Sequence, residues 1–430
     1  MSLLEAIRHH RARVTVLGLG YVGLPLSVEI ADAGFAVTGY DIKADRVQAL
    51  SGGESDVADV SSRRLRQAIS RGKLRLTSDA ADVAAEVFLI CVPTPFGKAR
   101  QPDLSCVTQA ARDVAAHVRR GTLVVLESTT YPGTTREIVR PILESSGRQA
   151  GRDFALAFAP ERVDPGNGAY RVANTPRIVG GLTPRCARTA RRFYRQFTPR
   201  VRIVSSLETA EMSKLMENTF RHVNIALVNE MAVLCTDLGV DVWEMIDAAA
   251  TKPFGFMAFY PGPGVGGHCI PIDPCYLSYR ARELGRQTRF VELAEAINEQ
   301  MPDYVVSRVA DALNERSKAL RGARLLVIGA AYKRDVADTR ESPALKVIAK
   351  LRQKGAIVRY HDPYVLEVNG TGETLRSVPL TPQEMRNSDC AVVVTDHSSL
   401  PYGELVRHCP LIFDTRNALK RYRADNVVRL

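Results

Sequence analysis

Short apolar runs alternate with segments of helical spacing along the first half of the chain. The apolar runs, which indicate buried strands, lie at 13–18, 35–41, 87–92, 123–126 and 154–158. Helical spacing of apolar residues occurs at 21–33, at 107–118 and from residue 134. Strands that alternate with helices predict a parallel, doubly wound α/β sheet. We assign this first domain to residues 1–205.

The pattern changes after residue 205. From 208 to 238 the spacing is helical with few helix-breaking residues, a long stretch for one globular helix. We expect a helical middle region over 206–315 that separates two domains and offers a surface for a subunit interface. The strand and helix pattern then returns, and a second, smaller α/β domain is expected over 316–430. Its predicted elements are strands at 324–329, 357–360, 390–395 and 411–413 and a helix at 342–354.

Composition and charge exclude several classes of protein. The 430 residues are 45% hydrophobic and 24% charged, which fits a globular protein and not a disordered one. The formal net charge is +11, but the basic residues are spread along the chain at helical spacing. This distribution indicates solvated helix faces, so we expect no nucleic-acid partner. No apolar run has the length needed to span a bilayer, and we expect no membrane association.

The cysteines and the amino-terminal residues indicate in which cellular compartment the protein is found. Eight cysteines are scattered along the chain without a CxxC pair. This usage favours reduced thiols over a disulfide framework. The segment before the first strand is too short and too polar for a signal peptide. We therefore expect a cytoplasmic protein.

A glycine motif follows the first predicted strand. Gly18, Gly20 and Gly23 form GxGxxG at the point where a strand passes into a helix. Such glycines permit a tight turn, a close approach of the backbone to a pyrophosphate, and close packing of helix on sheet. Asp41 closes the second strand, where a carboxylate accepts hydrogen bonds from a ribose diol and repels a 2′-phosphate. The motif predicts NAD as the cofactor, and a flavin is the alternative for the motif taken alone.

A second motif surrounds Cys269. The segment 259–273 is rich in glycine and proline, and we expect it to be a shaped loop rather than a helix or a central strand. It presents Cys269 between His268 and Asp273. A thiolate nucleophile needs a polar environment of this kind, whereas most cysteines are small buried apolar residues. His268 and Asp273 have no second ligand cluster nearby, so we expect no metal site.

A nucleophilic thiol combined with NAD implies oxidation of an aldehyde. The aldehyde is trapped as a thiohemiacetal, oxidised to a thioester, and released by water as a carboxylate. Each tetrahedral stage needs hydrogen-bond donors for its oxyanion. Lys214, Asn218 and Arg221 share one face of the long predicted helix and are candidates, with a solvated basic face as the alternative. Apolar residues of the same stretch that we expect in the core are Met212, Leu215 and Met216.

These motifs, in this order, resemble the UDP-glucose/GDP-mannose dehydrogenase family over nearly the whole chain. The matching segments are GLGYVGLP at 18–25, CVPTP at 91–95, EST at 127–129, PERVDPG at 160–166, KLMEN at 214–218, GGHC at 266–269 and AYKRDVADTRESP at 331–343. The resemblance implies an N-terminal Rossmann domain for NAD, a central helical region with a long dimer-forming helix, and a C-terminal Rossmann-like domain for UDP. A homodimer or higher homo-oligomer is therefore expected.

The resemblance also implies roles for individual residues. Cys269 would be the nucleophile, Lys214 and Asn218 would stabilise the oxyanion, and Asp273 would assist proton transfer or activate water. The residues expected to hold the catalytic water are Thr129 and Glu161. Those expected at the cofactor are Gly18, Gly20, Tyr21, Val22, Gly23, Asp41, Arg46, Pro93, Thr94 and Thr129. Those expected at the substrate are Glu161, Arg162, Val163, Lys214, Asn218, Arg221, Tyr260, Gly266, Lys333 and Arg340.

Two departures from the family pattern concern the sugar. Family members that act on UDP-glucose usually carry a lysine directly before the aspartate, where this chain has Ile272. They also tend to carry a different stretch where this chain has residues 162–165. Both differences resemble the branch that acts on UDP-N-acetyl sugars, closest to UDP-N-acetylglucosamine 6-dehydrogenases of surface-polysaccharide synthesis, such as that of lipopolysaccharide O-antigen.

Other readings of the sequence stay open. UDP-N-acetylmannosamine, UDP-N-acetylgalactosamine and UDP-glucose are the alternative substrates. A non-catalytic nucleotide-sugar-binding protein is the alternative from another class, although the complete set of Cys269, Lys214 and Asp273 argues against it. A two-electron dehydrogenase of the hydroxyacid type would share the first domain but would need neither the cysteine loop nor the second α/β domain.

Overall fold

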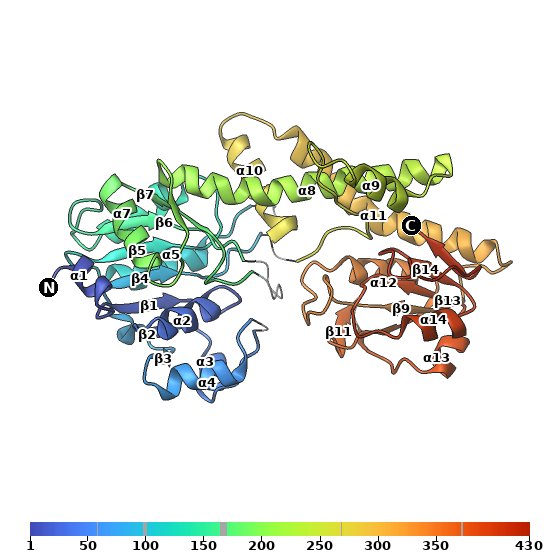
Figure 1. The fold of residues 1–430 in the computed structure, drawn as a ribbon, viewed down its shortest axis with the longest axis horizontal. Coiled ribbons are helices and arrows are strands. Elements are labelled where there is room, and N and C mark those ends of the chain that lie inside the picture. The colour runs from blue at the N-terminus through green and yellow to red at the C-terminus, as the bar shows by residue number, and fades with distance from the viewer. Residues whose placement is uncertain (58, 98–100, 164–169, 268, 371–372) are drawn as a thin grey trace. The chain divides into compact units, whose positions relative to one another are not determined.

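The structure, a computed structural model, describes residues 1–57, 59–97, 101–163, 170–267, 269–370 and 373–430 (Figure 1). The chain divides into two compact units. The first unit comprises residues 1–217 and 275–286, and the second comprises residues 218–274 and 287–430. Two of the three divisions fall inside helices, α8 (Leu207–Leu238) and α10 (Cys269–Glu283), and the third follows the end of α10.

The first unit contains an eight-stranded sheet in the order β3-β2-β1-β4-β5-β6-β7-β8. Its strands are β1 (Arg13–Leu17), β2 (Ala36–Tyr40), β3 (Leu74–Thr77), β4 (Val87–Ile90), β5 (Leu123–Leu126), β6 (Ala155–Phe158), β7 (Arg177–Gly181) and β8 (Val201–Ile203). All neighbouring pairs are parallel except β6 and β7. The predicted α/β class with a parallel sheet is confirmed, and the predicted strands agree with those observed to within two residues at either end.

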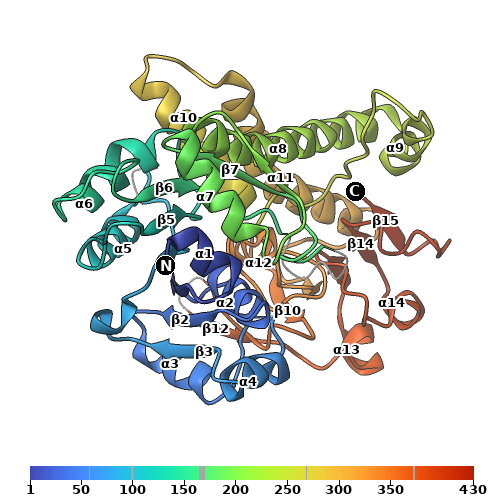
Figure 2. The same ribbon diagram turned by 60° about the vertical axis from the view of Figure 1, so that its left-hand side comes forward.

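Helices cover both faces of this sheet (Figures 1 and 2). They are α1 (Leu3–Arg8), α2 (Gly23–Asp32), α3 (Ala44–Ser51), α4 (Ser62–Ser70), η1 (Ala80–Val83), α5 (Ser105–Ala115), η2 (Thr135–Val139), α6 (Arg140–Glu144) and α7 (Pro184–Tyr194). One apolar cluster joins α1, α2 and α7 to the sheet, and another joins α5, η2 and α6 to it. The central strands β4 and β5 are apolar and buried at every position, because a sheet covered on both faces buries the side chains of both faces.

The long helix α8 is confirmed, with 32 residues. Its apolar residues do not all face a core. Leu215 is fully buried as expected, but Met212 and Met216 are 39% and 57% exposed, so the prediction of core contacts for these two is wrong. Residues 212 and 216 are four apart and lie on one face of the helix, which leaves that face apolar and exposed.

The second unit contains a parallel five-stranded sheet in the order β10-β9-β13-β14-β15. Its strands are β9 (Arg324–Ile328), β10 (Ile357–His361), β13 (Cys390–Val393), β14 (Ile412–Asp414) and β15 (Val427–Arg429), with an antiparallel hairpin of β11 (Glu367–Gly370) and β12 (Glu373–Arg376). Its helices, besides the part of α8 after residue 217 and the part of α10 up to residue 274, are α9 (Val242–Ala250), α11 (Arg289–Asn314), α12 (Pro343–Gln353), α13 (Pro382–Asn387) and α14 (Tyr402–His408). This confirms the predicted second α/β domain, to which the structure adds β15 and the hairpin.

The glycine-rich segment corrects one prediction. We expected a loop over 259–273, but α10 begins at Cys269. Pro271 stands in the first turn of α10, where a missing N–H breaks no helical hydrogen bond, so the proline is compatible with helix there. Pro274 lies inside the helix. Among the described residues, no helix combines the length and the apolar character that a membrane crossing requires.

Candidate functional site

The glycine turn of the first unit joins β1 to α2. Gly18 has a φ of +88°, and a Cβ on it would lie 2.7 Å from the carbonyl oxygen of Cys91. A Cβ on Gly23 would lie 1.8 Å from the carbonyl oxygen of Gly18. Gly20 differs, because a Cβ there would meet no atom within 4 Å. The turn therefore leaves open space over Gly20 at the start of α2, where a pyrophosphate fits. The other two predicted positions of the turn are Tyr21, which is exposed, and Val22, which directly precedes the helix.

Asp41, directly after β2, and Arg46, on α3, both bind this turn. One carboxylate oxygen of Asp41 accepts a hydrogen bond of 2.9 Å from the N–H of Leu19, and the other accepts one of 3.1 Å from the N–H of Lys43. Arg46 donates to the carbonyl oxygen of Leu19 at 3.0 Å and forms an ion pair with Asp56. Each Asp41 oxygen keeps a lone pair for a ribose hydroxyl. Both predicted residues thus border the glycine turn.

The other predicted cofactor residues follow β4 and β5. Pro93 and Thr94 come three and four residues after β4, and Thr129 comes three residues after β5. Since β4 pairs with β1, the order of strands reverses between these two strands, and dinucleotides bind at the carboxyl ends of strands at such a reversal. Thr94 is buried, and its carbonyl oxygen accepts a hydrogen bond of 2.8 Å from the hydroxyl of Tyr276 on α10. The predicted residues therefore share the carboxyl edge of the sheet with the glycine turn.

A buried ion-pair network that the sequence analysis missed lies in the same unit. Arg177, at the start of β7, forms ion pairs of 2.7 Å with Glu127 and 2.6 Å with Glu161. The hydroxyl of Tyr194 donates to Glu127 at 2.5 Å. Burial alone would lower the pKa of Arg177, but the two carboxylates outweigh it and raise that pKa. Burial also raises the pKa of Glu127. No local pattern in the sequence marks Arg177.

The network accounts for the hydrogen bonds of Glu161, which we expected to hold water. Its Oε2 accepts from Arg177, and its Oε1 accepts from the backbone N–H groups of Arg162 and Val163 at 2.6 and 2.8 Å. Arg162 in turn pairs with Glu217 at 2.6 Å. Both oxygens of Glu161 are thus held in place within the unit. The rest of the predicted 160–166 motif, residues 164–166, lies outside the described residues.

The predicted oxyanion residues on α8 differ in burial. Lys214 and Asn218 are only 8% and 5% exposed, whereas Arg221 is exposed. The alternative interpretation, a solvated basic face, therefore fits Arg221 but does not fit Lys214 and Asn218. In the second unit, the side-chain amide of Asn218 donates to the carboxylate of Asp273 at 2.5 Å, and Asp273 is buried. The structure thus brings together two of the predicted catalytic residues, 55 positions apart in the sequence.

Cys269 is exposed, in contrast to several other cysteines. Cys91, Cys390 and Cys409 are buried, and burial raises the pKa of each thiol, that of Cys409 to about 12. Cys269 is the first residue of α10, and the amino-terminal end of a helix favours negative charge, which suits a thiolate. An exposed cysteine at such a position is suited to nucleophilic attack. His268 lies outside the described residues.

In the second unit the glycine-rich segment contacts the 331–343 motif. A Cβ on Gly266 would lie 2.8 Å from Cβ of Tyr332, and one on Gly267 would lie 2.8 Å from its ring. The N–H of Gly267 donates to the carbonyl oxygen of Arg340 at 2.9 Å. Tyr332 lies so close to the backbone that only glycine fits at positions 266 and 267. Two predicted substrate motifs, distant in sequence, thus meet, with Lys333 half-buried and Arg340 paired with Asp338.

An acid in the second unit repeats the arrangement of Asp41. Asp362 follows β10, and its Oδ2 accepts hydrogen bonds of 2.7 and 2.9 Å from the N–H groups of Ala330 and Ala331. Burial alone would raise the pKa of Asp362, but these bonds and His397, 3.0 Å away, lower it to about 2. The charged form therefore fixes the start of the 331–343 motif. Asp362 is not among the predicted site residues, although it directly follows the second strand of its domain, as Asp41 does.

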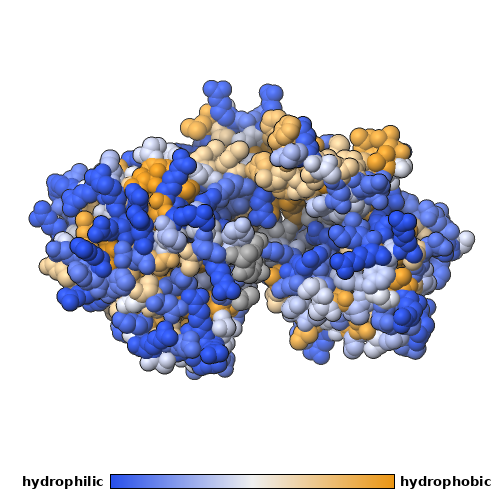
Figure 3. Space-filling view, in the orientation of Figure 1, coloured by the Kyte–Doolittle hydropathy of each residue, from blue (hydrophilic) through white to orange (hydrophobic). Residues whose placement is uncertain are grey.

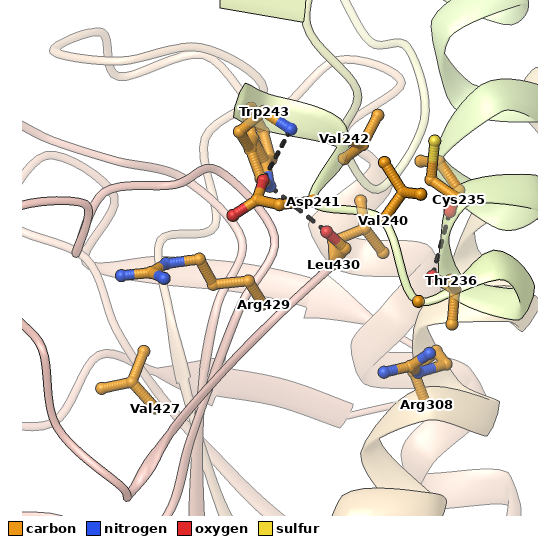
Figure 4. A pocket seen from close by; sticks show the side chains of 12 residues that line it. Cys235, Thr236, Val240, Asp241, Val242, Trp243, Arg308, Val427, Arg429 and Leu430 are labelled. Carbon is orange, nitrogen blue, oxygen red and sulfur yellow. Dashed lines mark hydrogen bonds between the residues drawn. The ribbon is translucent and has the colours of Figure 1, made fainter. Parts of the chain in front are cut away.

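Two features of the second unit lie apart from these contacts. Tyr260 donates its hydroxyl to Asp247 at 2.6 Å and stacks on Trp243, so it is tied to α9. A cavity of about 300 Å³ (Figure 4) is lined by residues of α8, α9, α11 and β15, among them Arg308 and Arg429. No residue that we predicted at the site lines this cavity.

Comparison with known proteins agrees with this geometry. Models of the UDP-glucose/GDP-mannose dehydrogenase family match in order: the NAD binding domain at residues 12–198, the central domain at 208–300 and the UDP binding domain at 326–421. A UDP-N-acetyl-D-mannosamine dehydrogenase of Pyrococcus horikoshii is 39% identical, over 95% of this chain and 96% of that protein. A UDP-N-acetyl-D-glucosamine 6-dehydrogenase of Pseudomonas aeruginosa is 36% identical, over 82% and 83%.

A solved structure extends the agreement to three dimensions. The structure of a UDP-D-ManNAc dehydrogenase from Pyrococcus horikoshii has a TM-score of 0.89 and 37% identity, and the match covers 97% of this chain and 98% of that one. The NAD binding domain supports NAD as the cofactor, and the UDP binding domain supports a UDP-sugar substrate. The chain therefore belongs to the UDP-glucose/GDP-mannose dehydrogenase family and is an NAD-dependent nucleotide-sugar dehydrogenase.

Proposed function

We propose that this enzyme oxidises the C6 hydroxyl of a UDP-N-acetylhexosamine to a carboxylate. One sugar, two NAD⁺ and one water give the uronate, two NADH and three protons. The observation that carries the proposal is that Cys269 is exposed at the start of α10, four residues before an Asp273 that is hydrogen-bonded to Asn218. A thiol nucleophile is what a dehydrogenase needs to carry an aldehyde on to an acid.

The cofactor fits the first unit. The open space over Gly20, the start of α2 and the carboxylate of Asp41 suit the pyrophosphate and a ribose of NAD. The residues proposed to hold it are Gly18, Gly20, Tyr21, Val22, Gly23, Asp41, Arg46, Pro93, Thr94 and Thr129. When bound, NAD accepts one hydride in each of the two oxidations.

Residues of the protein carry out the other steps of the reaction. The sulfur of Cys269 adds to the C6 aldehyde to form a thiohemiacetal, which becomes a thioester in the second oxidation. Lys214 and Asn218 donate hydrogen bonds to the oxyanion of the tetrahedral stages. Asp273 accepts or returns the proton, and water, held by Thr129 and Glu161, releases the carboxylate and regenerates the thiol. The residues proposed to bind the UDP-sugar are Glu161, Arg162, Val163, Lys214, Asn218, Arg221, Tyr260, Gly266, Lys333 and Arg340.

The proposal also names which epimer of UDP-N-acetylhexosamine is the substrate. The departures at Ile272 and at residues 162–165 resemble the branch that acts on UDP-N-acetyl sugars, and because that resemblance is closest to UDP-N-acetylglucosamine 6-dehydrogenases, UDP-N-acetyl-D-glucosamine is the first candidate. UDP-N-acetyl-D-mannosamine is the second candidate, since a relative named for it has higher identity and coverage than the relative named for the gluco epimer. The uronate would serve surface-polysaccharide synthesis. We place the reaction in the cytoplasm, because the eight cysteines are scattered along the chain without a CxxC pair, a usage that favours reduced thiols.

The stoichiometry of NADH tests the reaction. We expect two NADH for each sugar consumed, with the uronate as product, because the thioester step commits the aldehyde to a second oxidation. UDP-GlcNAc, UDP-ManNAc, UDP-GalNAc and UDP-glucose are assayed in parallel by absorbance of NADH and by mass spectrometry. A ratio of one NADH per sugar contradicts the double oxidation. Binding of NAD and UDP without turnover of any sugar would instead support the non-catalytic alternative.

We also propose that the enzyme is a homodimer that pairs through α8. Exposed apolar residues follow one face of this helix at intervals of four or seven; they are Met212, Met216, Phe220, Leu227, Leu234 and Leu238. Figure 3 shows apolar side chains gathered along α8. A continuous apolar stripe on a soluble protein marks an interaction surface, and a second copy presents a complementary stripe.

Light scattering after size exclusion tests the dimer. The change of Leu227→Glu together with Leu234→Glu places two charges in the stripe, and we expect the mass to fall from dimer to monomer. Phe290→Glu is the matched control, because Phe290 is an exposed apolar residue of α11 outside the stripe. A double variant that keeps the dimer mass would refute pairing through α8.

A further inference from the structure

Two buried asparagines in the second unit connect three segments of the chain. Asn229 on α8 accepts a hydrogen bond of 2.9 Å from the N–H of Gly262 through its Oδ1. Its Nδ2 donates to Oδ1 of Asn298 on α11 at 2.9 Å. Asn298 then donates through Nδ2 to the carbonyl oxygen of His222, one α8 turn beyond Asn218, at 3.3 Å. Asn229 and Asn298 are fully and 97% buried, so solvent cannot replace these bonds.

The asparagine chain fixes one end of the loop that leads to the nucleophile. Gly262 begins this loop and is bonded to Asn229, while Gly267 ends it and is bonded to the carbonyl oxygen of Arg340. Cys269 follows two residues later. Between the two anchors, Gly264 has a φ of +122°, and a Cβ there would lie 3.1 Å from the carbonyl oxygen of Asn298. The loop is therefore closely fitted to α11, and a loss of one anchor would let it shift.

The same face of α8 carries a predicted catalytic residue. Asn229 follows Asn218 by eleven residues, which is about three helical turns, so the two side chains point in nearly the same direction. Asn218 bonds to Asp273 beyond the loop, and Asn229 bonds to Gly262 at its start. One rigid helix thus holds both sides of the segment that contains Cys269.

We infer that Asn229 and Asn298 are positioning residues for the nucleophile: their paired amides set the place of the 262–267 loop, and through it the place of Cys269. This inference rests on the proposed role of Cys269. Neither amide is expected to touch substrate or cofactor. Asn229 accepts a hydrogen bond from Gly262 and donates one to Asn298 at the same time. A side-chain amide can do both, whereas an aspartate or an alkyl side chain cannot. A displacement of about 1 Å at a reacting group costs roughly 100-fold in rate.

Alanine substitutions test the inference on the full-length enzyme. For Asn229→Ala we expect kcat to fall by about 100-fold while KM for NAD changes less than twofold, because the NAD residues belong to the first unit. We expect Asn298→Ala to give a smaller loss. The double variant should be no more than twofold worse than Asn229→Ala, because both changes disrupt one chain of hydrogen bonds. Asn229→Asp keeps the acceptor for Gly262 and should retain more kcat than Asn229→Ala.

A readout independent of turnover accompanies the kinetics. The rate at which iodoacetamide labels Cys269, measured by peptide mass spectrometry, should change at least fivefold in Asn229→Ala. Asn426→Ala is the matched control, because Asn426 also donates to two carbonyl oxygens, of Val406 and Cys409, but far from the loop in sequence. The control should lower thermal stability and leave kcat and labelling within twofold.

The outcomes separate this inference from the proposed function. A folded Asn229→Ala with kcat and labelling within twofold of the parent overturns the positioning role. Equal losses in Asn229→Ala and Asn426→Ala also overturn it, because they would show a general effect of stability. If the parent enzyme oxidises no UDP-sugar, the proposed function fails, and the labelling rate of Cys269 still decides whether the asparagines position it.

Discussion

Replacing Cys269 with serine should abolish formation of the uronate, with a loss of at least three orders of magnitude. A serine hydroxyl keeps the shape of the residue but stays protonated near neutral pH, whereas a thiol supplies a thiolate. Without the thioester, the aldehyde cannot be carried to the acid by this route. The measurement is uronate by mass spectrometry, with NADH followed in parallel. Unchanged turnover in Cys269→Ser would rule out the covalent mechanism.

The neighbouring cysteine provides the control. Cys275 lies on the same helix, six residues after Cys269, and is half-buried. Cys275→Ser introduces the same chemical change into α10 without touching the proposed nucleophile. We expect this variant to keep its activity within a few-fold and both proteins to bind NAD alike. A loss of activity in Cys275→Ser equal to that in Cys269→Ser would point to damage of α10 rather than to loss of a nucleophile.

The second large effect concerns stability. Arg177→Met should lower the free energy of unfolding by about 3–5 kcal/mol, because it leaves Glu127 buried without its cation. For a unit of this size the expected fall in Tm is about 10 °C. Burial already raises the pKa of Glu127, and removal of Arg177 should raise it further. Thermal and denaturant unfolding followed by circular dichroism measure the change.

Two comparisons make this prediction specific. Arg13→Met breaks an exposed ion pair with Glu86 at 2.7 Å, which should cost less than about 1 kcal/mol. Adding Glu127→Gln to Arg177→Met removes the buried, unpaired charge of the Glu127 carboxylate, and the double variant should recover part of the lost stability. Equal effects of Arg177→Met and Arg13→Met would show that the buried network contributes no more than a surface pair.

Local patterns determined much of what could be predicted. The apolar strands and helical spacing predicted both α/β domains and the long α8, because side-chain periodicity reports the local backbone and its burial. The glycine turn and Asp41 predicted the nucleotide edge of the first unit, since each glycine is required by its own backbone position. Errors arose where burial depends on distant partners. Met212 and Met216 fit a helical apolar pattern, yet the first unit leaves them exposed.

The sequence by itself therefore determined the two α/β folds, the cofactor class and the candidate nucleophile, all of which depend on neighbouring residues and on motif order. Only the tertiary structure decided which charges and amides pair. Arg177 meets Glu127 across 50 positions, and Asn229 meets Asn298 across 69. It also decided that Cys269 begins a helix. Side-chain pairing at such separations depends on how the helices and strands pack against one another, and this packing produces no periodic pattern in the sequence.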